Sequence, residues 1–257
     1  MLASGPFDTS SRKLLGANYK IMQENATTMP GRVLAVLGMH RSGTSCLTGS
    51  LQDLGVELGD CHTWNPYNKK GNRENQGFVD LHDAILNANG GSWDNPPRRV
   101  VWQPEHFDQA KALLTRYSGV ELFGFKDPRA LLVLDGWKSL LPSIEFVGVF
   151  RHPEAVVESL SNRSGLARER ALSLWLSYNT ALWREYKARP FPVLCFDEEE
   201  RVFQEKVVEL ASSLRLTGGK SSPQFYDIDL KQFAGESLLD LPWRVKRLYR
   251  KLRNVSC

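Results

Sequence analysis

The stretch VLAVLGMHRSGTS, residues 33–45, decides the fold of this 257-residue chain. Its first five residues are all apolar, which is typical of a strand that is buried on both faces of a sheet. The glycine-containing turn that follows leads into a segment in which Leu47, Leu51 and Leu54 recur at helical spacing. Backbone N–H groups in a turn between a buried strand and a helix can surround an anionic phosphate. The stretch therefore predicts a phosphate-binding loop.

This loop departs from the GxxxxGK[ST] pattern of phosphate loops at one position. Thr44 stands where that pattern has the lysine that reaches the β- and γ-phosphates of a nucleotide. The cation of the loop is instead Arg41, which comes earlier in the turn. The alternative interpretation is a glycine turn that holds an incidental arginine.

Three further apolar runs are candidate strands, at residues 121–125, 144–150 and 191–196, and helical patterns separate them. Strands that alternate with helices predict a parallel sheet covered by helices on both faces. We therefore expect a three-layer α/β/α fold, in which the polar residues that follow the strands meet at one edge of the sheet. Residues 1–31 are polar and rich in turn-forming residues, so we expect a leader there and a single domain over residues 32–257.

The composition excludes several classes of protein. A hydrophobic fraction of 42% with 24% charged residues lies far from the composition of disordered chains and fibres. No apolar run approaches the roughly 20 residues that span a bilayer, so no stable membrane insertion is expected. The four cysteines form no CxxC pair, which argues against a metal site. A formal net charge of +4 gives no support to nucleic-acid binding, and a cytoplasmic location is expected.

The loop resembles that of the sulfotransferase superfamily that uses 3′-phosphoadenosine 5′-phosphosulfate (PAPS), in particular the branch with the motif G-x-H-R-S-G-T-S. A second segment, VGVFRHP at residues 147–153, resembles the 3′-phosphate motif of that superfamily when it is taken together with Ser159. In the motif, an arginine at the end of a strand and a serine about two turns later bind the 3′-phosphate, and Arg151 and Ser159 match these positions. Taken singly, Arg151 is compatible with a surface salt bridge, and Ser159 is compatible with a solvated position on a helix.

The middle of the chain resembles the same branch. Three segments carry this likeness. NKKGNRE at residues 68–74 resembles the family pattern N-P-K-G-x-x-E, GSWDNPP at residues 91–97 resembles G-x-W-D-x-P-P, and FKDPR at residues 125–129 contains the K-D-P-R signature. Three positions depart from the patterns, with Lys69 in place of proline, Asn72 in place of an aromatic residue and His152 where aspartate is common. The first two departures fall in the expected acceptor loop, so they affect the choice of substrate more than the activity.

The resemblance implies a P-loop sulfotransferase fold, PAPS as the sulfate donor and no metal. Sulfuryl transfer in line needs positioning and charge stabilisation, by analogy with phosphoryl transfer. Arg41 is the candidate that binds the 5′-phosphosulfate and stabilises the leaving phosphate. Because a guanidinium does not readily lose its proton, we expect Arg41 to act as an electrostatic stabiliser and not as a proton donor. The complete set of expected cofactor-binding residues is Arg41, Ser42, Gly43, Thr44, Ser45, Arg151 and Ser159.

The acceptor hydroxyl must lose a proton as it attacks the sulfur, which requires a carboxylate or an imidazole. Glu74 is the best candidate, because it matches the acid of the N-P-K-G-x-x-E segment. His40 beside the loop cation is a further catalytic candidate, and His62 and His82 are held in reserve, although a packed histidine is the preferred interpretation of His82. A solvated loop glutamate is the alternative for Glu74.

Four residues are expected to bind the substrate: Lys126, Arg129, Trp93 and Asp94. Lys126 and Arg129 follow a strand and should face the cleft, where they hold the sulfate or the acceptor or simply tie the loop down by a salt bridge. Trp93 and Asp94 could bind a sugar ring, and an aromatic cap over the core is the alternative. Residues 243–253 predict a basic amphipathic helix, with one packed stripe and a solvated basic face as the favoured interpretation.

The leading hypothesis is a PAPS-dependent sulfotransferase that acts on a hydroxyl of a carbohydrate or of a glycosylated or lipid-linked small molecule. The expected partner is this small-molecule or glycan acceptor, and whether the chain forms a homodimer is left open. One alternative is a small-molecule kinase, with residues 131–135 as the strand that carries a Walker B aspartate. The other is a non-catalytic module that binds a nucleotide.

Overall fold

The computed structural model describes residues 29–63, 71–225, 238 and 240–257. Within them a central sheet has four strands that are all parallel and lie in the order β2-β1-β3-β4. The strands are β1 (Arg32–Leu37), β2 (Leu122–Lys126), β3 (Glu145–Phe150) and β4 (Val193–Cys195). Each of the four apolar runs read from the sequence thus overlaps a strand. Most of the expected leader, residues 1–28, lies outside the described residues.

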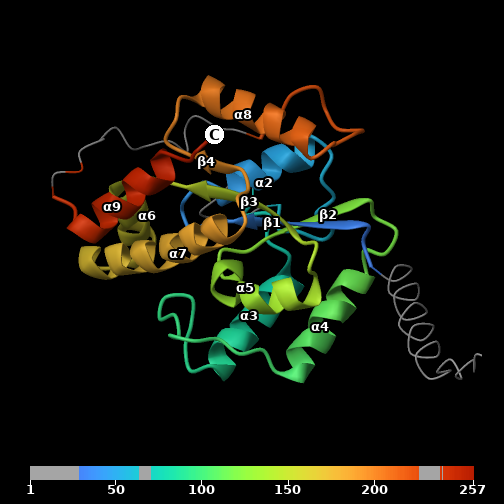
Figure 1. The fold of residues 1–257 in the computed structure, drawn as a ribbon, viewed down its shortest axis with the longest axis horizontal. Coiled ribbons are helices and arrows are strands. Elements are labelled where there is room, and N and C mark those ends of the chain that lie inside the picture. Colours follow the sequence, from blue (N-terminus) through green and yellow to red (C-terminus); the bar gives the residue numbers. More distant parts are fainter. Residues whose placement is uncertain (1–28, 64–70, 226–237, 239) are drawn as a thin grey trace, which may run out of the picture.

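Helices cover both faces of the sheet, so the expected three-layer α/β/α architecture is confirmed (Figure 1). One face is covered by α2 (Thr44–Asp53) and α8 (Glu200–Ser213). The helices of the opposite layer are α3 (Gln76–Ala88), α4 (Pro104–Thr115), α5 (Ala130–Leu140), α6 (Pro153–Ser164), α7 (Arg168–Ala188) and α9 (Trp243–Arg253).

The alternation of side chains along β1 divides the core into two parts. Val33, Ala35 and Leu37 belong to the larger cluster under α3, α5 and α7, whereas Leu34 and Val36 belong to the cluster under α2 and α8. Successive residues of a strand point to opposite faces, so a run that is apolar at every position has to be covered on both sides. The unbroken apolar run is therefore the local reason for the three layers.

The order of the strands places one ligand-binding edge beside β1. After β1 the chain goes to β2 on one side of it, and then crosses to β3 on the other side. Ligands of open parallel sheets bind at the carboxyl ends of the strands at such a switch point. Val36 pairs with Lys126 and Leu37 pairs with Gly148, so the loop after β1, the end of β2 and the end of β3 meet at this edge.

Residues 131–135 lie in α5, so the prediction that they form a Walker B strand is wrong. A short apolar run reads equally well as a buried strand or a buried helix, and here it forms part of an 11-residue helix. The kinase hypothesis therefore loses its expected Walker B strand. In the part of the chain that the structure describes, no helix is both long and apolar enough to cross a membrane.

Candidate functional site

The loop after β1 leads directly into a helix N-terminus. Helix α2 begins at Thr44, and its N-cap Gly43, which has φ of 87°, offers no side chain to cap the first N–H groups. A Cβ atom at Gly43 would lie 2.3 Å from the ring of Phe196, so only glycine fits this position. The first-turn N–H groups have no partner within the helix and carry the positive end of its dipole. The loop is therefore suited to an anion.

Arg41 sits in this loop with φ of 66°, a backbone conformation that is uncommon outside glycine. Its Nε donates a hydrogen bond to the hydroxyl oxygen of Ser159 on α6, at 2.7 Å. Burial and the neighbouring charges of Arg163 and Arg151 lower the pKa of Arg41 from its ordinary value. A bound anion would relieve this crowding of positive charge, which makes an anionic ligand the natural counterpart of the loop.

Arg151, at the end of β3, stands behind the loop. Its Nε lies 3.4 Å from a carboxylate oxygen of Asp197, and its guanidinium lies 5.4 Å from the centre of the Phe196 ring. One of its N–H groups donates to the backbone oxygen of Arg41, at 3.5 Å. The structure thus brings Arg41, Arg151 and Ser159 together, which the spacing of the sequence motifs predicts.

His152 stands where the related motif commonly has aspartate, and its position in the fold accounts for the exchange. It is the N-cap of α6, and its ring Nδ1 accepts a hydrogen bond from the backbone N–H of Glu154. Aspartate at an N-cap accepts the same kind of bond. The departure therefore leaves the start of the helix intact.

A small cavity of about 90 Å³ opens beside the loop. Its lining residues come from the loop, the segment before α3, the end of β2 and α6: His40, Arg41, Thr44, Ser45, Asn72, Glu74, Lys126, Pro128, Arg129 and Arg163. Four of these side chains are cationic and one is a carboxylate, so the cavity has an excess of positive charge. This volume suits a small anionic group and not a whole nucleotide.

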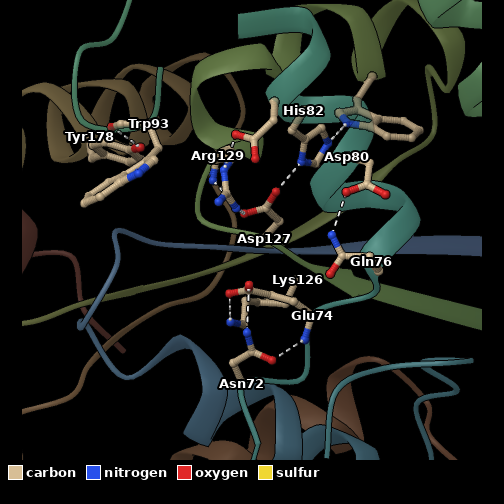
Figure 2. Close-up of polar contacts among 12 residues, drawn as sticks. Asn72, Glu74, Gln76, Asp80, His82, Trp93, Lys126, Asp127, Arg129 and Tyr178 are labelled. Atoms are coloured by element: carbon tan, nitrogen blue, oxygen red, sulfur yellow. Dashed lines mark hydrogen bonds and ion pairs between the residues drawn. The ribbon is translucent and has the colours of Figure 1, made fainter. Parts of the chain in front are cut away.

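Glu74 supplies the carboxylate of the cavity and is held by two donors (Figure 2). Its Oε1 accepts from Nζ of Lys126 at 2.7 Å, and its Oε2 accepts from the amide of Asn72 at 2.8 Å. The backbone oxygen of Glu74 accepts from the backbone N–H of His62 at 2.8 Å. The side chain of Lys126 is 2% exposed and that of Glu74 is 14% exposed.

A buried chain of hydrogen bonds orients Arg129. Asp127 accepts a hydrogen bond from Nδ1 of His82 at 2.7 Å and another from the guanidinium of Arg129 at 2.8 Å (Figure 2). On the other side of the imidazole, the indole N–H of Trp137 donates to Nε2 of His82 at 2.8 Å. An indole only donates, so Nε2 must accept and the proton of His82 must be on Nδ1. Burial works against the charge of Asp127, but the bond from His82 and the charge of Arg129 hold the pKa of Asp127 below its ordinary value.

His40 packs against aromatic side chains at the other end of the cavity. Its ring centre lies 4.8 Å from that of Trp93 and 5.9 Å from that of Tyr178, whose hydroxyl donates to the backbone oxygen of Trp93. Burial, together with the charge of Arg129, lowers the pKa of His40 to about 3, so its imidazole is neutral near pH 7. Among the described residues, its buried Nε2 has no hydrogen-bond partner.

The predicted site residues lie in several parts of this region. Those that line the cavity are His40, Arg41, Thr44, Ser45, Glu74, Lys126 and Arg129. Ser42 and Gly43 form the loop itself, and Arg151 and Ser159 contact Arg41 from behind. Trp93 lies behind His40, and the carboxylate of Asp94 accepts a hydrogen bond from Ser92 within its own turn. His82 is fully buried in the core, which agrees with the preferred interpretation of that residue.

Sequence reasoning missed three contributors to this region. Arg163 lines the cavity, and the available signal was its place one helical turn after Ser159 on the same helix. Asp127 belongs to the K-D-P-R segment, but the sequence assigns it no role. No sequence pattern indicates a role for Trp137. Of the matched segment at residues 68–74, residues 68–70 lie outside the described residues. No group of His, Cys, Asp and Glu side chains suited to a metal ion occurs in the described ranges.

The chain matches no protein-family model and no curated protein sequence. A solved structure with a similar fold is the sulfotransferase domain from the Synechococcus PCC 7002 olefin synthase, which is 18% identical, with a TM-score of 0.51 over 90% of each chain. The sulfotransferase STF1 from Mycobacterium tuberculosis H37Rv is 14% identical, with a TM-score of 0.43 over 93% of this chain and 81% of its own. The protein TT1252 from Thermus thermophilus is 17% identical, with a TM-score of 0.39 over 74% of this chain and 100% of its own. At this level of identity, the likeness to the olefin synthase domain shows a shared fold.

Proposed function

We propose that this chain transfers a sulfuryl group from PAPS to an acceptor hydroxyl. The observation that carries the proposal is the first turn of α2, whose Thr44 and Ser45 line a cavity together with four cationic side chains and one carboxylate. A site with this charge balance suits a transferred group with anionic oxygens and a phosphate leaving group. The shared fold with a sulfotransferase domain supports the same assignment.

The donor is held from the loop side. PAPS supplies the sulfuryl group and, as its leaving group, adenosine 3′,5′-bisphosphate. The first-turn N–H groups of α2, with the hydroxyls of Thr44 and Ser45, bind the 5′-phosphosulfate, and Arg41 neutralises the charge that develops on the leaving phosphate. Arg151 and Ser159, both in contact with Arg41, bind the 3′-phosphate. Arg41 acts only as a charge, because a guanidinium keeps its proton.

The proton of the acceptor hydroxyl goes to Glu74. A carboxylate oxygen has two lone pairs, so the bonds from Lys126 and Asn72 leave room for the hydroxyl to donate. The neutral imidazole of His40 lines the same cavity, and its Nε2, which has no hydrogen-bond partner among the described residues, can form a hydrogen bond with the acceptor. Lys126 and Arg129, both on the cavity wall, hold the sulfuryl oxygens during transfer. The acceptor that we propose is a carbohydrate or a glycosylated or lipid-linked small molecule.

The test is a calorimetric titration that needs no acceptor. Adenosine 3′,5′-bisphosphate, ATP with magnesium and adenosine 5′-phosphate are titrated separately into the full chain and into the Arg41→Ala variant. Tight binding of the bisphosphate, a weak response to the other two nucleotides and loss of affinity in the variant are the expected results. A preference for ATP, or no binding of the bisphosphate, would refute the proposal.

A further inference from the structure

A second and larger cavity lies outside the site described above. It is a groove of about 580 Å³ between residues 96–102, α5 and α7. Ligand pockets for small molecules have volumes of about 300–1,000 Å³, so the groove has the size of a binding site. Its wall mixes apolar side chains such as Pro96 and Pro97 with the hydroxyls of Ser177 and Thr180.

The wall formed by residues 96–102 is fixed in place by the core. The backbone N–H and oxygen of Val101 both bond to the side-chain amide of Asn89, at 2.9 and 3.0 Å. The indole N–H of Trp102 donates to the backbone oxygen of Val133, and its ring fills the space beside Gly136, where a Cβ atom would lie only 2.1 Å away. A ligand therefore meets a preformed surface and does not have to order it.

The groove carries positive charge without a matching acid. Arg98 and Arg99 make no hydrogen bond or ion pair with any other described residue, and both are exposed. Asp135, the acid of the wall, is paired with Lys138 at 2.7 Å. The third cation, Arg184, already contacts the carboxylate of a neighbouring residue. Two uncompensated guanidinium groups at a preformed groove suit an anionic ligand.

The groove adjoins the transfer cavity. Trp93, just before the groove wall, contacts His40 of the cavity. The hydroxyl of Tyr178 donates to the backbone oxygen of Trp93 at 2.8 Å, and the neighbours of Tyr178 on α7, Ser177 and Thr180, line the groove. Trp93 and Tyr178 therefore lie between a residue that lines the cavity and the segments that line the groove.

We propose that this groove binds an anionic group on a distal part of the acceptor. The substrate class is then an acceptor that carries both the reacting hydroxyl and a carboxylate, sulfate or phosphate, with Arg98 and Arg99 as specificity residues. The inference rests on the proposed function, because it assigns the groove to the same acceptor.

The test uses sucrose octasulfate as the anionic probe and sucrose as its uncharged match, in calorimetric titrations of the full chain at low salt. The groove variant is Arg98→Ser/Arg99→Ser. The matched control is Arg244→Ser/Arg247→Ser, which removes two exposed arginines from another groove, between α7 and α9, that shares Thr180 with the first. The groove variant should bind the probe about 5- to 30-fold more weakly, and the control should bind it normally. Added salt should reduce the difference.

Two results would overturn the inference: no binding of the probe to the unmodified chain, or an equal loss in the control variant. Binding of adenosine 3′,5′-bisphosphate, measured on the same samples, separates the two proposals. Bisphosphate binding without probe binding would overturn the groove assignment and leave the proposed function standing. Probe binding that depends on Arg98 and Arg99, without bisphosphate binding, would refute the proposed function and leave an anion-binding groove.

Discussion

The substitution Glu74→Gln separates the proposed proton transfer from the structural role of the same side chain. Glutamine keeps the shape of the side chain and a carbonyl oxygen that accepts from Lys126, but it cannot take a proton from the acceptor. Loss of a general base lowers the catalytic rate by about 10²- to 10⁴-fold. The affinity for adenosine 3′,5′-bisphosphate should change little, because Glu74 is assigned to the acceptor.

The structure also predicts a cost in stability. Nζ of Lys126 lies 2.7 Å from the carboxylate, and only 2% of the lysine side chain is exposed. Removal of one partner of a buried ion pair costs about 3–5 kcal/mol. Because the glutamine carbonyl still accepts a hydrogen bond from the ammonium, we expect a loss near the lower end, about 3 kcal/mol. Urea denaturation followed by circular dichroism measures this loss as a lower midpoint.

The double variant Glu74→Gln/Lys126→Met is the matched control. It removes the ammonium that the single variant leaves without a counter-charge, so the free energy of unfolding should recover. Turnover should stay low, because Lys126 is itself assigned to the sulfuryl oxygens, so the double variant is a control for stability. Turnover is measured at saturating PAPS with an acceptor found by screening. A near-normal catalytic rate in Glu74→Gln would refute the assignment of the base and direct the search to His40. Recovery of turnover together with stability would show that neither Glu74 nor Lys126 takes part in the transfer.

Three further predictions concern the loop and the network beneath it. Arg41→Ala should lower the rate of transfer by about 10²- to 10³-fold or more, and substantial retained turnover would remove Arg41 from the mechanism. Arg151→Ala should weaken binding of adenosine 3′,5′-bisphosphate by about 10- to 100-fold, and an equal loss for adenosine 5′-phosphate would contradict the 3′-phosphate contact. The pKa of Asp127 is lowered by folding, so its contribution to stability is complete above the unfolded pKa of about 4 and is lost as the pH falls toward the folded value. Asp127→Asn should therefore reduce stability at pH 7 and flatten its dependence on pH below about 4; unchanged acid unfolding would show that His82 and Arg129 do not stabilise this charge.

The sequence by itself determined the layers of this protein and the position of the loop that we propose binds phosphate. An apolar run with no polar alternation has to be covered on both faces, and four such runs separated by helical patterns leave a parallel sheet as the consistent arrangement. The loop after β1 and the arginine that ends β3 could be placed because they follow strands directly, and the carboxyl ends of parallel strands share one edge. These inferences depend only on periodicity and order along the chain.

The tertiary structure alone decided which side chains meet. Lys126 pairs with Glu74 across 52 positions of sequence, and His82 bonds to Asp127 across 45, and neither pairing follows from a local pattern. Residues 131–135 show the same limit, because an apolar run has no intrinsic preference that separates a buried helix from a buried strand. Contacts between distant residues depend on how helices pack on the sheet and which donors remain without partners, and both are properties of the folded core.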